Sequence, residues 1–263
     1  MTAAQAAGVP GLQVWLADLD TLAPTLEAIE TTAGLLSPDE RAWPALGPAA
    51  SRTKRRLARI ALRVLLERSG ATEARGVPFQ LDGHGKPQTA SGQPHFNASH
   101  CRHMGLFALA PRGPLGIDIE LDRNVGLGPE RRALIEAAGL AMASTAGRGM
   151  PSIEHSASNA AFLQAWTCLE AFAKARGNGI GALLTDLGIT AAGARSLQPG
   201  EAARRATALV AASGLAVAAL ELPEGTWGTI AAPRDLLAGS IRVQALEPDG
   251  AQRFELPVTA SAP

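Results

Sequence analysis

The segment that most constrains this chain is Leu115–Leu121, where apolar and acidic side chains alternate one by one. A period of two is typical of a strand with one buried face, so Asp118 and Glu120 leave the same face, with Cα atoms roughly 6.5–7 Å apart. Two carboxylates this close repel each other unless a cation or a basic side chain lies between them. Mg²⁺ is commonly held by one or two carboxylates together with water and phosphate oxygens. Taken alone, the segment favours the simpler interpretation of an acidic strand face in contact with solvent.

Composition and charge narrow the class of protein. The chain has 263 residues, 46% of them hydrophobic and 18% charged, as in a globular protein with a sizeable core. Its 24 basic and 24 acidic residues cancel, so we expect no nucleic-acid partner and no attraction to an anionic membrane. Cys101 and Cys168 lack metal-ligand spacing. With no signal peptide at the N-terminus and no run of ~20 apolar residues, we expect a cytoplasmic protein without a membrane span.

The order of predicted elements favours an α+β fold. Long helices are predicted at 51–69 and 158–176, and a shorter one begins at Ser37, because Glu40 follows three residues later as in a capping box. Strands are predicted at 12–16, 104–109, 115–121, within 208–222, and at 226–230, 241–246 and 254–258, with a helix at 131–142 and a loop at 144–158. Because this order is not a regular βαβ alternation, we favour α+β over a parallel doubly wound sheet.

The helix predicted at 51–69 carries an arginine ridge, which we define as Arg52, Arg55, Arg56, Arg59 and Arg63. These side chains fall within an arc of roughly 100° opposite the apolar stripe of the helix. Glu67 is the single acid nearby in the sequence. The ridge is therefore either a solvated face or a surface for an anionic partner.

The helix predicted at 158–176 places Trp166, Glu170 and Lys174 on one face, at positions i, i+4 and i+8. Glu170 and Lys174 can form an ordinary ion pair along the helix, which contributes about 0.2–0.5 kcal/mol. Alternatively, Glu170 supplies a third carboxylate beside the acidic strand, with Lys174 next to it. That second arrangement would suit Mg²⁺ and a diphosphate.

Five motifs between residues 35 and 181 resemble one known family in order and in spacing. They are Ala61–Leu66 (L-R-x-L-L), Gly85–Pro87 (G-K-P), Phe96–His100 (F-N-x-S-H), Gly116–Glu120 (G-[IV]-D-[IVL]-E) and Trp166–Lys174 (W-x-x-K-E-A-x-x-K), the last followed by Gly177 and Gly179. Together they are similar to those of the 4′-phosphopantetheinyl transferase superfamily, in its single-chain, two-lobed, surfactin-synthetase-activating form. Each motif alone is weak, whereas the ordered set is specific.

Three features depart from the family pattern. Leu169 stands where the helix motif has its first lysine, so one basic contact expected near the phosphates is missing. The aromatic-rich segment usual between the two acidic motifs is not visible in 123–158. Residues 233–263 exceed the core pattern, and we expect a C-terminal extension with a hairpin and a frayed tail.

The resemblance implies a phosphopantetheinyl transferase fold of two similar lobes in one chain, each a small, mostly antiparallel sheet packed on a long helix. The N-terminal lobe would span 1–113, and the C-terminal lobe, which carries the metal site, would span 114–232. Because such a chain can form its site between its own halves, we expect a monomer.

The resemblance also implies an activity, the Mg²⁺-dependent transfer of the 4′-phosphopantetheine arm of coenzyme A to a serine of an acyl or peptidyl carrier protein, with release of 3′,5′-ADP. Asp118, Glu120 and Glu170 would hold Mg²⁺, with Mn²⁺ as the alternative, against the diphosphate. Glu170 or a metal-bound water would take the proton of the serine hydroxyl. Lys174 would stabilise the leaving group, so the catalytic residues implied are Glu170, Lys174 and His100.

Coenzyme A would be bound by Lys86 and Pro87 at its adenine nucleotide end, by Ser99 and His100 at its phosphates, and by Lys174. Two roles stay open for the arginine ridge. It could meet an acidic carrier protein, or its Arg63 end could reach the 3′-phosphate of coenzyme A.

Two other functions compete with this one. Leu169 favours a non-catalytic paralogue that binds coenzyme A or a carrier without turnover, whereas the three acidic positions favour an enzyme. A different Mg²⁺-dependent phosphohydrolase would not explain the Phe96–His100 and Trp166–Lys174 motifs together.

Overall fold

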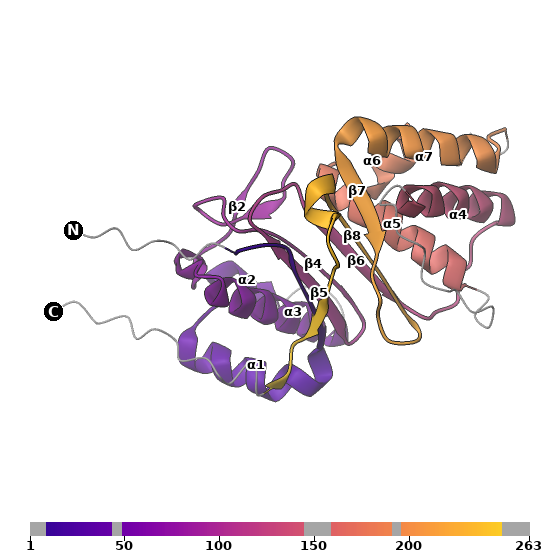
Figure 1. Ribbon diagram of the computed structural model, residues 1–263. Helices are drawn as coiled ribbons and strands as arrows, with labels where there is room; N and C mark the ends of the chain where they lie inside the picture. Colours follow the sequence, from indigo (N-terminus) through magenta and orange to yellow (C-terminus); the bar gives the residue numbers. More distant parts are fainter. Residues whose placement is uncertain (1–8, 44–48, 145–158, 191–195, 249–263) are drawn as a thin grey trace.

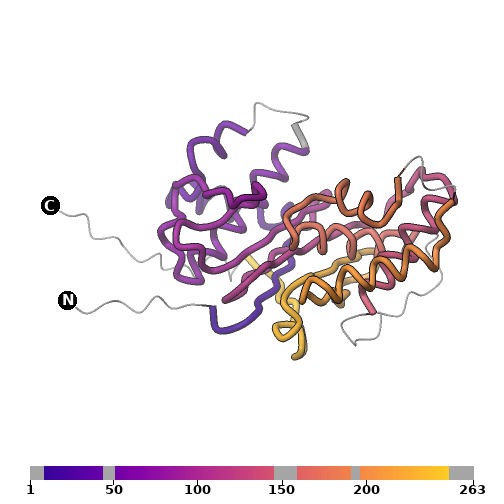
Figure 2. The backbone as a smooth tube through the Cα atoms, turned by 90° about the horizontal axis from the view of Figure 1, so that it is seen from above, coloured from indigo at the N-terminus to yellow at the C-terminus, as the bar shows by residue number. Residues whose placement is uncertain are grey.

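The computed structural model of the protein describes residues 9–43, 49–144, 159–190 and 196–248. Two β-sheets lie back to back at its centre, and helices cover the outer face of each (Figure 1). Seen from above, the helices of the first part of the chain lie on one side of the strands and those of the later part on the other (Figure 2).

The first sheet has the strand order β4-β5-β1-β9. Its strands are β1 (Gln13–Asp18), β4 (His95–Cys101), β5 (Met104–Ala110) and β9 (Val243–Ala245), and its helices are α1 (Leu19–Ala33), α2 (Pro38–Ala42) and α3 (Ala49–Arg68). The β1–β5 and β4–β5 pairs are antiparallel, whereas β9 lies parallel to β1. Strand β4 is therefore one edge of this sheet.

The second sheet has the order β6-β8-β7, and both of its strand pairs are antiparallel. Its strands are β6 (Gly116–Leu121), β7 (Leu215–Ala219) and β8 (Thr226–Pro233), and its helices are α4 (Pro129–Ala143), α5 (Ala160–Arg176), α6 (Gly179–Asp186) and α7 (Pro199–Ser213). The remaining described elements are the hairpin β2 (Gln80–Leu81) and β3 (Pro87–Gln88) and the 3₁₀ turns η2 (Thr72–Ala74) and η5 (Arg234–Leu237).

Alternation along the strands explains the layers. In β5, Leu106 faces the second sheet, while Phe107 packs among the helices of the first. In β7, Ala216 faces the first sheet, while Val217 packs among α4, α5 and α7. Each apolar strand thus contributes to two cores, because successive side chains leave opposite faces.

Helix α5 lies close against β6, and this contact positions the candidate site. A Cβ atom on Gly116 would overlap the carbonyl oxygen of Ala171, so glycine is required for the approach. The face of β6 that carries Asp118 and Glu120 is consequently covered by α5. The simpler interpretation of that strand face as solvated is wrong.

The α+β class is confirmed, and so are both long helices, the helix near 131–142 and the capped start of α2. Ser37 Oγ accepts from the Glu40 amide at 3.3 Å, and Glu40 Oε2 accepts from the Ser37 amide at 2.9 Å. The sequence analysis missed α1, α6 and α7, and the strand predicted within 208–222 is restricted to β7. In the described part of the chain, no helix is long and apolar enough to cross a membrane.

The described part of the C-terminal extension returns to the first sheet. Val243–Ala245 pairs with β1, and the Leu246 amide donates to the Leu16 carbonyl at 2.8 Å. The strand predicted at 254–258 and most of the loop predicted at 144–158 lie outside the described residues. The hairpin, the two-lobed organisation and the boundary at residues 113/114 therefore stay predictions.

Candidate active site

The two sheets meet at their edge strands β4 and β6, which are joined by side chains. Asn97 Oδ1 accepts from the Ile117 amide at 2.8 Å, and Ser99 Oγ donates to Asp118 Oδ1 at 2.7 Å. Further along, Cys101 Sγ lies 3.4 Å from Glu120 Oε2. Alternate side chains of β4 therefore fix the position of β6 and of both of its carboxylates.

A cavity of about 180 Å³ opens beside this seam, and we call it the carboxylate cavity. It is lined by Ser99, His100, Cys101, Asp118, Ile119, Glu120, Trp166, Glu170 and Lys174. Strand β4, strand β6 and helix α5 each contribute to it. The structure thus brings together six of the predicted site residues, namely Ser99, His100, Asp118, Glu120, Glu170 and Lys174.

Lys174 is the central cation of the cavity. Its Nζ lies 2.6 Å from Asp118 Oδ1, 3.0 Å from Ser99 Oγ and 3.2 Å from the Ile117 carbonyl. In the described structure, Lys174 pairs with Asp118 and not with Glu170. The ordinary i, i+4 ion pair along the helix is therefore not formed.

Glu120 has a cation of its own. Arg123 donates to both of its carboxylate oxygens, through Nη2 at 3.0 Å and Nε at 3.1 Å. The backbone of Arg123 is anchored because its carbonyl accepts from Asn159 Nδ2 at 3.1 Å, just before α5 begins. The Arg123 side chain is 37% exposed. This arginine was missed in the sequence, although its position three residues after Glu120 is the available signal.

The pKa values of two carboxyl groups in the cavity are raised. Burial, despite the ammonium of Lys174, raises the pKa of Asp118 above its usual range. Burial also raises the pKa of Glu170, and the negative charges of Asp118 and Glu120 add to the effect. Among the described residues, Glu170 is the carboxylate of this cavity with no ion pair. The cavity therefore holds more negative than positive charge.

His100 lines the same cavity from β4. Partial burial lowers the pKa of its imidazole, and the positive charges of Arg55 and Lys174 lower it further. A neutral imidazole can both donate and accept a hydrogen bond at a polar ligand. Of the arginine ridge, Arg55 is thus the member whose charge acts on this region.

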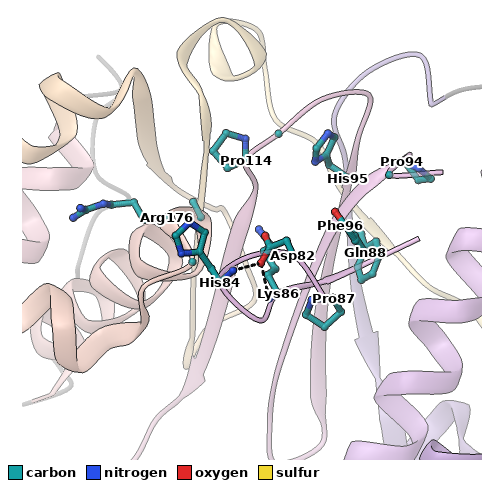
Figure 3. Close-up of a pocket in the computed structure, with 14 residues that line it drawn as sticks. Asp82, His84, Lys86, Pro87, Gln88, Pro94, His95, Phe96, Pro114 and Arg176 are labelled. Atoms are coloured by element: carbon teal, nitrogen blue, oxygen red, sulfur yellow. Dashed lines mark hydrogen bonds between the residues drawn. The ribbon is translucent and has the colours of Figure 1, made fainter. Parts of the chain in front are cut away.

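Lys86 and Pro87 line a second cavity, of about 380 Å³, which we call the Lys86 cavity (Figure 3). His84 and Lys86 come from the β2–β3 turn, where both amides donate to Asp82 Oδ1. The Lys86 ammonium donates to the Leu115 carbonyl and, at 3.4 Å, to the Lys174 carbonyl. Burial lowers the pKa of Lys86 to about 8. The structure therefore places Lys86 and Pro87 beside the carboxylate cavity rather than in it.

The structure does not bring Arg63 to either cavity. The side chain is 1% exposed, and Nε donates to Glu40 Oε2 at 2.7 Å. Its other nitrogens donate to the carbonyls of Ala74 and Val77, and its guanidinium lies over the Phe79 ring. This environment does not favour the alternative in which Arg63 reaches the 3′-phosphate of coenzyme A, because each of its side-chain nitrogens already has a partner inside the fold.

Three of the five arginines of the ridge, Arg56, Arg59 and Arg63, form ion pairs within the fold. Arg56 pairs with Glu27 of α1, and Arg59 pairs with Glu40 of α2. Glu67, the acid nearby in the sequence, pairs instead with Arg75. The neutralising acids come from other helices, so the sequence of α3 alone could not show them.

Leu169 has a different environment from the one expected. Its side chain is fully buried in the core shared by α4, α5 and α7, and it lines neither cavity. Position 169 therefore contributes packing here and not a phosphate contact. Helix α5 is further held by a buried polar contact, in which Gln164 Nε2 donates to Thr229 Oγ1 at 2.9 Å.

Divalent metal binding can be tested against the chemistry of these groups. Asp118, Glu120 and Glu170 are three hard oxygen donors on one cavity, which is the ligand type that Mg²⁺ prefers. As they stand, no group of three His, Cys, Asp or Glu side chains in the described part of the chain is arranged to hold a metal ion. The three carboxylates are therefore of the ligand type that suits Mg²⁺, while Asp118 is paired with Lys174 and Glu120 with Arg123.

One comparison connects this site with a family. The chain is 30% identical over 177 residues to a protein of Synechocystis named "Putative 4′-phosphopantetheinyl transferase", and the match covers 65% of this chain and 67% of that protein. No family model matches the chain. A fold and a cavity of this kind, together with that relative, show that the chain belongs to the 4′-phosphopantetheinyl transferase family. The two-lobed subtype is a finer statement that this match does not reach.

Proposed function

We propose that this protein transfers the 4′-phosphopantetheine arm of coenzyme A to a serine of an acyl or peptidyl carrier protein and releases 3′,5′-ADP. The observation that carries the proposal is the convergence of three carboxylates, one lysine and the Ser99–His100 pair on a single cavity. In a member of this family, that set provides groups for a metal, for a diphosphate and for a proton.

Asp118, Glu120 and Glu170 would hold Mg²⁺, or Mn²⁺ in its place, whose charge would neutralise the diphosphate of coenzyme A. Lys174 projects from α5 between Asp118 and Ser99, so its ammonium can move to a phosphate oxygen without leaving the cavity. Ser99 Oγ and the His100 imidazole border the same space and can donate to phosphate oxygens.

In the proposed reaction, the serine oxygen of the carrier attacks the β-phosphorus of coenzyme A. The bond from that phosphorus to the oxygen bridging the two phosphates breaks, and 3′,5′-ADP leaves with the electron pair. The serine proton must be removed, and either Glu170, which has no ion pair among the described residues, or a metal-bound water would accept it. Lys174 stabilises the charge that develops on the leaving phosphate.

The nucleotide end of coenzyme A is proposed to lie in the Lys86 cavity. This cavity adjoins the first, because the Lys86 ammonium lies 3.4 Å from the carbonyl of Lys174. It is lined by apolar groups such as Pro87 and Phe96 and by polar groups such as Gln88, as a nucleoside requires. A monomer in the cytoplasm, acting on coenzyme A and a carrier protein, completes the proposal.

The test is intact mass spectrometry of a panel of apo carrier proteins incubated with this protein, coenzyme A and Mg²⁺. We expect one carrier to gain the mass of a phosphopantetheine arm, and Glu170→Gln to slow the gain by about 100-fold or more. Glu201→Gln, on the surface of α7, is the matched control and should label at the normal rate. Labelling that is as fast with Glu170→Gln as with the unchanged protein would contradict the assigned role.

The second candidate is a non-catalytic paralogue that binds coenzyme A or a carrier. Its sequence argument was Leu169, which the buried position of that side chain weakens. The feature that still favours it is the engagement of Asp118 and Glu120 by internal cations. Coenzyme A binding by calorimetry with no labelling of any carrier would support this function instead.

A further inference from the structure

Two of the three carboxylates that line the cavity already have a counter-ion within the protein. Lys174 occupies Asp118, and Arg123 occupies both oxygens of Glu120, while Glu170 is left without an ion pair among the described residues. The three carboxylates and two cations leave one net negative charge. A divalent cation that enters the cavity without coenzyme A therefore finds one carboxylate, Glu170, that is not already in an ion pair among the described residues.

We propose that Arg123, with Lys174, acts as an internal counter-ion that prevents a divalent cation from binding before the diphosphate, so that metal and coenzyme A bind cooperatively. This inference rests on the proposed function, since it assigns an order of binding to the same site. Arg123 is a positioning residue in this scheme, because it acts through Glu120.

Binding of a metal ion by Glu120 requires that Arg123 be displaced. To use Glu120 as a ligand, the metal must break a two-contact arginine–carboxylate pair, whose acid is only 14% exposed. Bidentate pairs of this kind are among the stronger charged hydrogen bonds in proteins. Without another anion nearby, the displaced guanidinium and the displaced ammonium of Lys174 would face each other and the metal unpaired.

A diphosphate permits an exchange of partners. Arginine matches phosphate oxygens with the same two-pronged geometry that it uses on a carboxylate. Arg123 does not line the cavity itself but pairs with Glu120, which does. Its side chain is 37% exposed and its backbone is anchored by Asn159, so the side chain can turn from Glu120 to a phosphate bound beside it. Mg²⁺ itself is usually bound by one or two carboxylates plus substrate phosphates. Both cations thus find new partners only when the diphosphate is present.

The binding of metal and the binding of diphosphate are then linked. If the diphosphate releases Glu120 and Asp118 to the metal, the metal must raise the affinity for the diphosphate by the same factor. Removing Arg123 should therefore strengthen metal binding in the absence of coenzyme A and weaken the coupling between the two. A residue with a merely structural role would not produce this pair of effects.

The experiment is a titration of Mn²⁺ followed by its electron paramagnetic resonance signal, with and without coenzyme A, and with a protein-free control for the Mn²⁺–coenzyme A complex. For the unchanged protein, coenzyme A should raise Mn²⁺ affinity at least tenfold. Arg123→Met should bind Mn²⁺ about tenfold more tightly than the unchanged protein when coenzyme A is absent. Arg204→Met, which removes an exposed arginine paired with Glu201, is the control and should change neither value.

An Mn²⁺ affinity of Arg123→Met equal to or below that of the unchanged protein would overturn the proposal. If that variant does not fold, Arg123→Lys keeps the charge and loses the two-pronged contact, and an intermediate rise in Mn²⁺ affinity is expected. No rise in Arg123→Lys would again overturn it. Failure of the proposed function would look different, since no apo carrier protein would then gain the mass of a phosphopantetheine arm, whatever the Mn²⁺ affinities of the unchanged protein and of Arg123→Met.

Discussion

Arg63–Glu40 and Arg123–Glu120 are both arginine–carboxylate pairs, and they lie in opposite halves of the molecule. Arg63 is fully buried, and its remaining nitrogens donate to the backbone carbonyls of Ala74 and Val77. Arg123 pairs with Glu120, which lines a cavity together with two further carboxylates. We call the buried Arg63–Glu40 pair closed, and the pairs whose carboxylates line the carboxylate cavity, Arg123–Glu120 and Lys174–Asp118, open.

The two clusters differ in the sign of their excess charge and in whether a cavity adjoins them. Around Glu40, Arg59 and Arg63 provide two cations for one acid, and these three residues line neither of the two cavities described above. Around Glu120, acids outnumber cations and a cavity adjoins them. The two clusters thus carry opposite excess charge, and the acidic one adjoins a cavity, which is what makes it the candidate functional site.

The largest effect is expected from breaking the closed pair. Glu40→Ala removes the partner of Arg63 and of the capping box of α2, and a buried charge left without its partner typically costs about 3–5 kcal/mol. Urea unfolding followed by circular dichroism measures this free energy. Glu201→Ala, which removes solvent-exposed ion pairs, should lower the unfolding free energy far less than Glu40→Ala does. Equal losses in the two variants would show that burial does not distinguish these pairs.

A smaller effect is expected from breaking the open site. Lys174→Met leaves Asp118 without its ammonium, and we expect a loss of about 1–3 kcal/mol in unfolding free energy. Mg²⁺ should recover part of this loss, because a ligand that binds only the folded state stabilises it. The same addition should not help Glu40→Ala. Recovery of both variants, or of neither, would remove the proposed contrast between open and closed pairs.

The sequence predicted the groups that come from short-range patterns. The alternation in β6 placed Asp118 and Glu120 on one face, and helical spacing placed Glu170 and Lys174 on one face of α5. These patterns repeat every 2 residues in a strand and every 3.6 residues in a helix, so a short stretch of sequence is enough to reveal them.

The rest depended on contacts between distant segments. Arg63 lies 23 residues from Glu40, and nothing in the sequence of α3 shows that acid. The missed helix α7 is rich in alanine, so its apolar face is weakly marked. The parallel pairing of β9 with β1 joins the two ends of the described chain. Such pairings are set by the assembled layers and cannot be derived from local periodicity.

The smallest expected effect concerns the unpaired acid itself and sharpens the contrast between the two clusters. Because burial and neighbouring negative charge raise the pKa of Glu170 in the folded protein, the folded state binds its proton more tightly than the unfolded chain does. The contribution of Glu170 to stability therefore falls as the pH rises from about its ordinary value of 4.5 through the raised value. In Glu170→Gln this contribution is absent, so the variant should gain stability relative to the unchanged protein as the pH rises from 4.5 to 7.

Urea unfolding at several pH values measures the difference, and Mg²⁺ at pH 7 should reduce it by supplying the missing positive charge. A difference that is constant over this range would mean that Glu170 does not carry the uncompensated negative charge assigned to it.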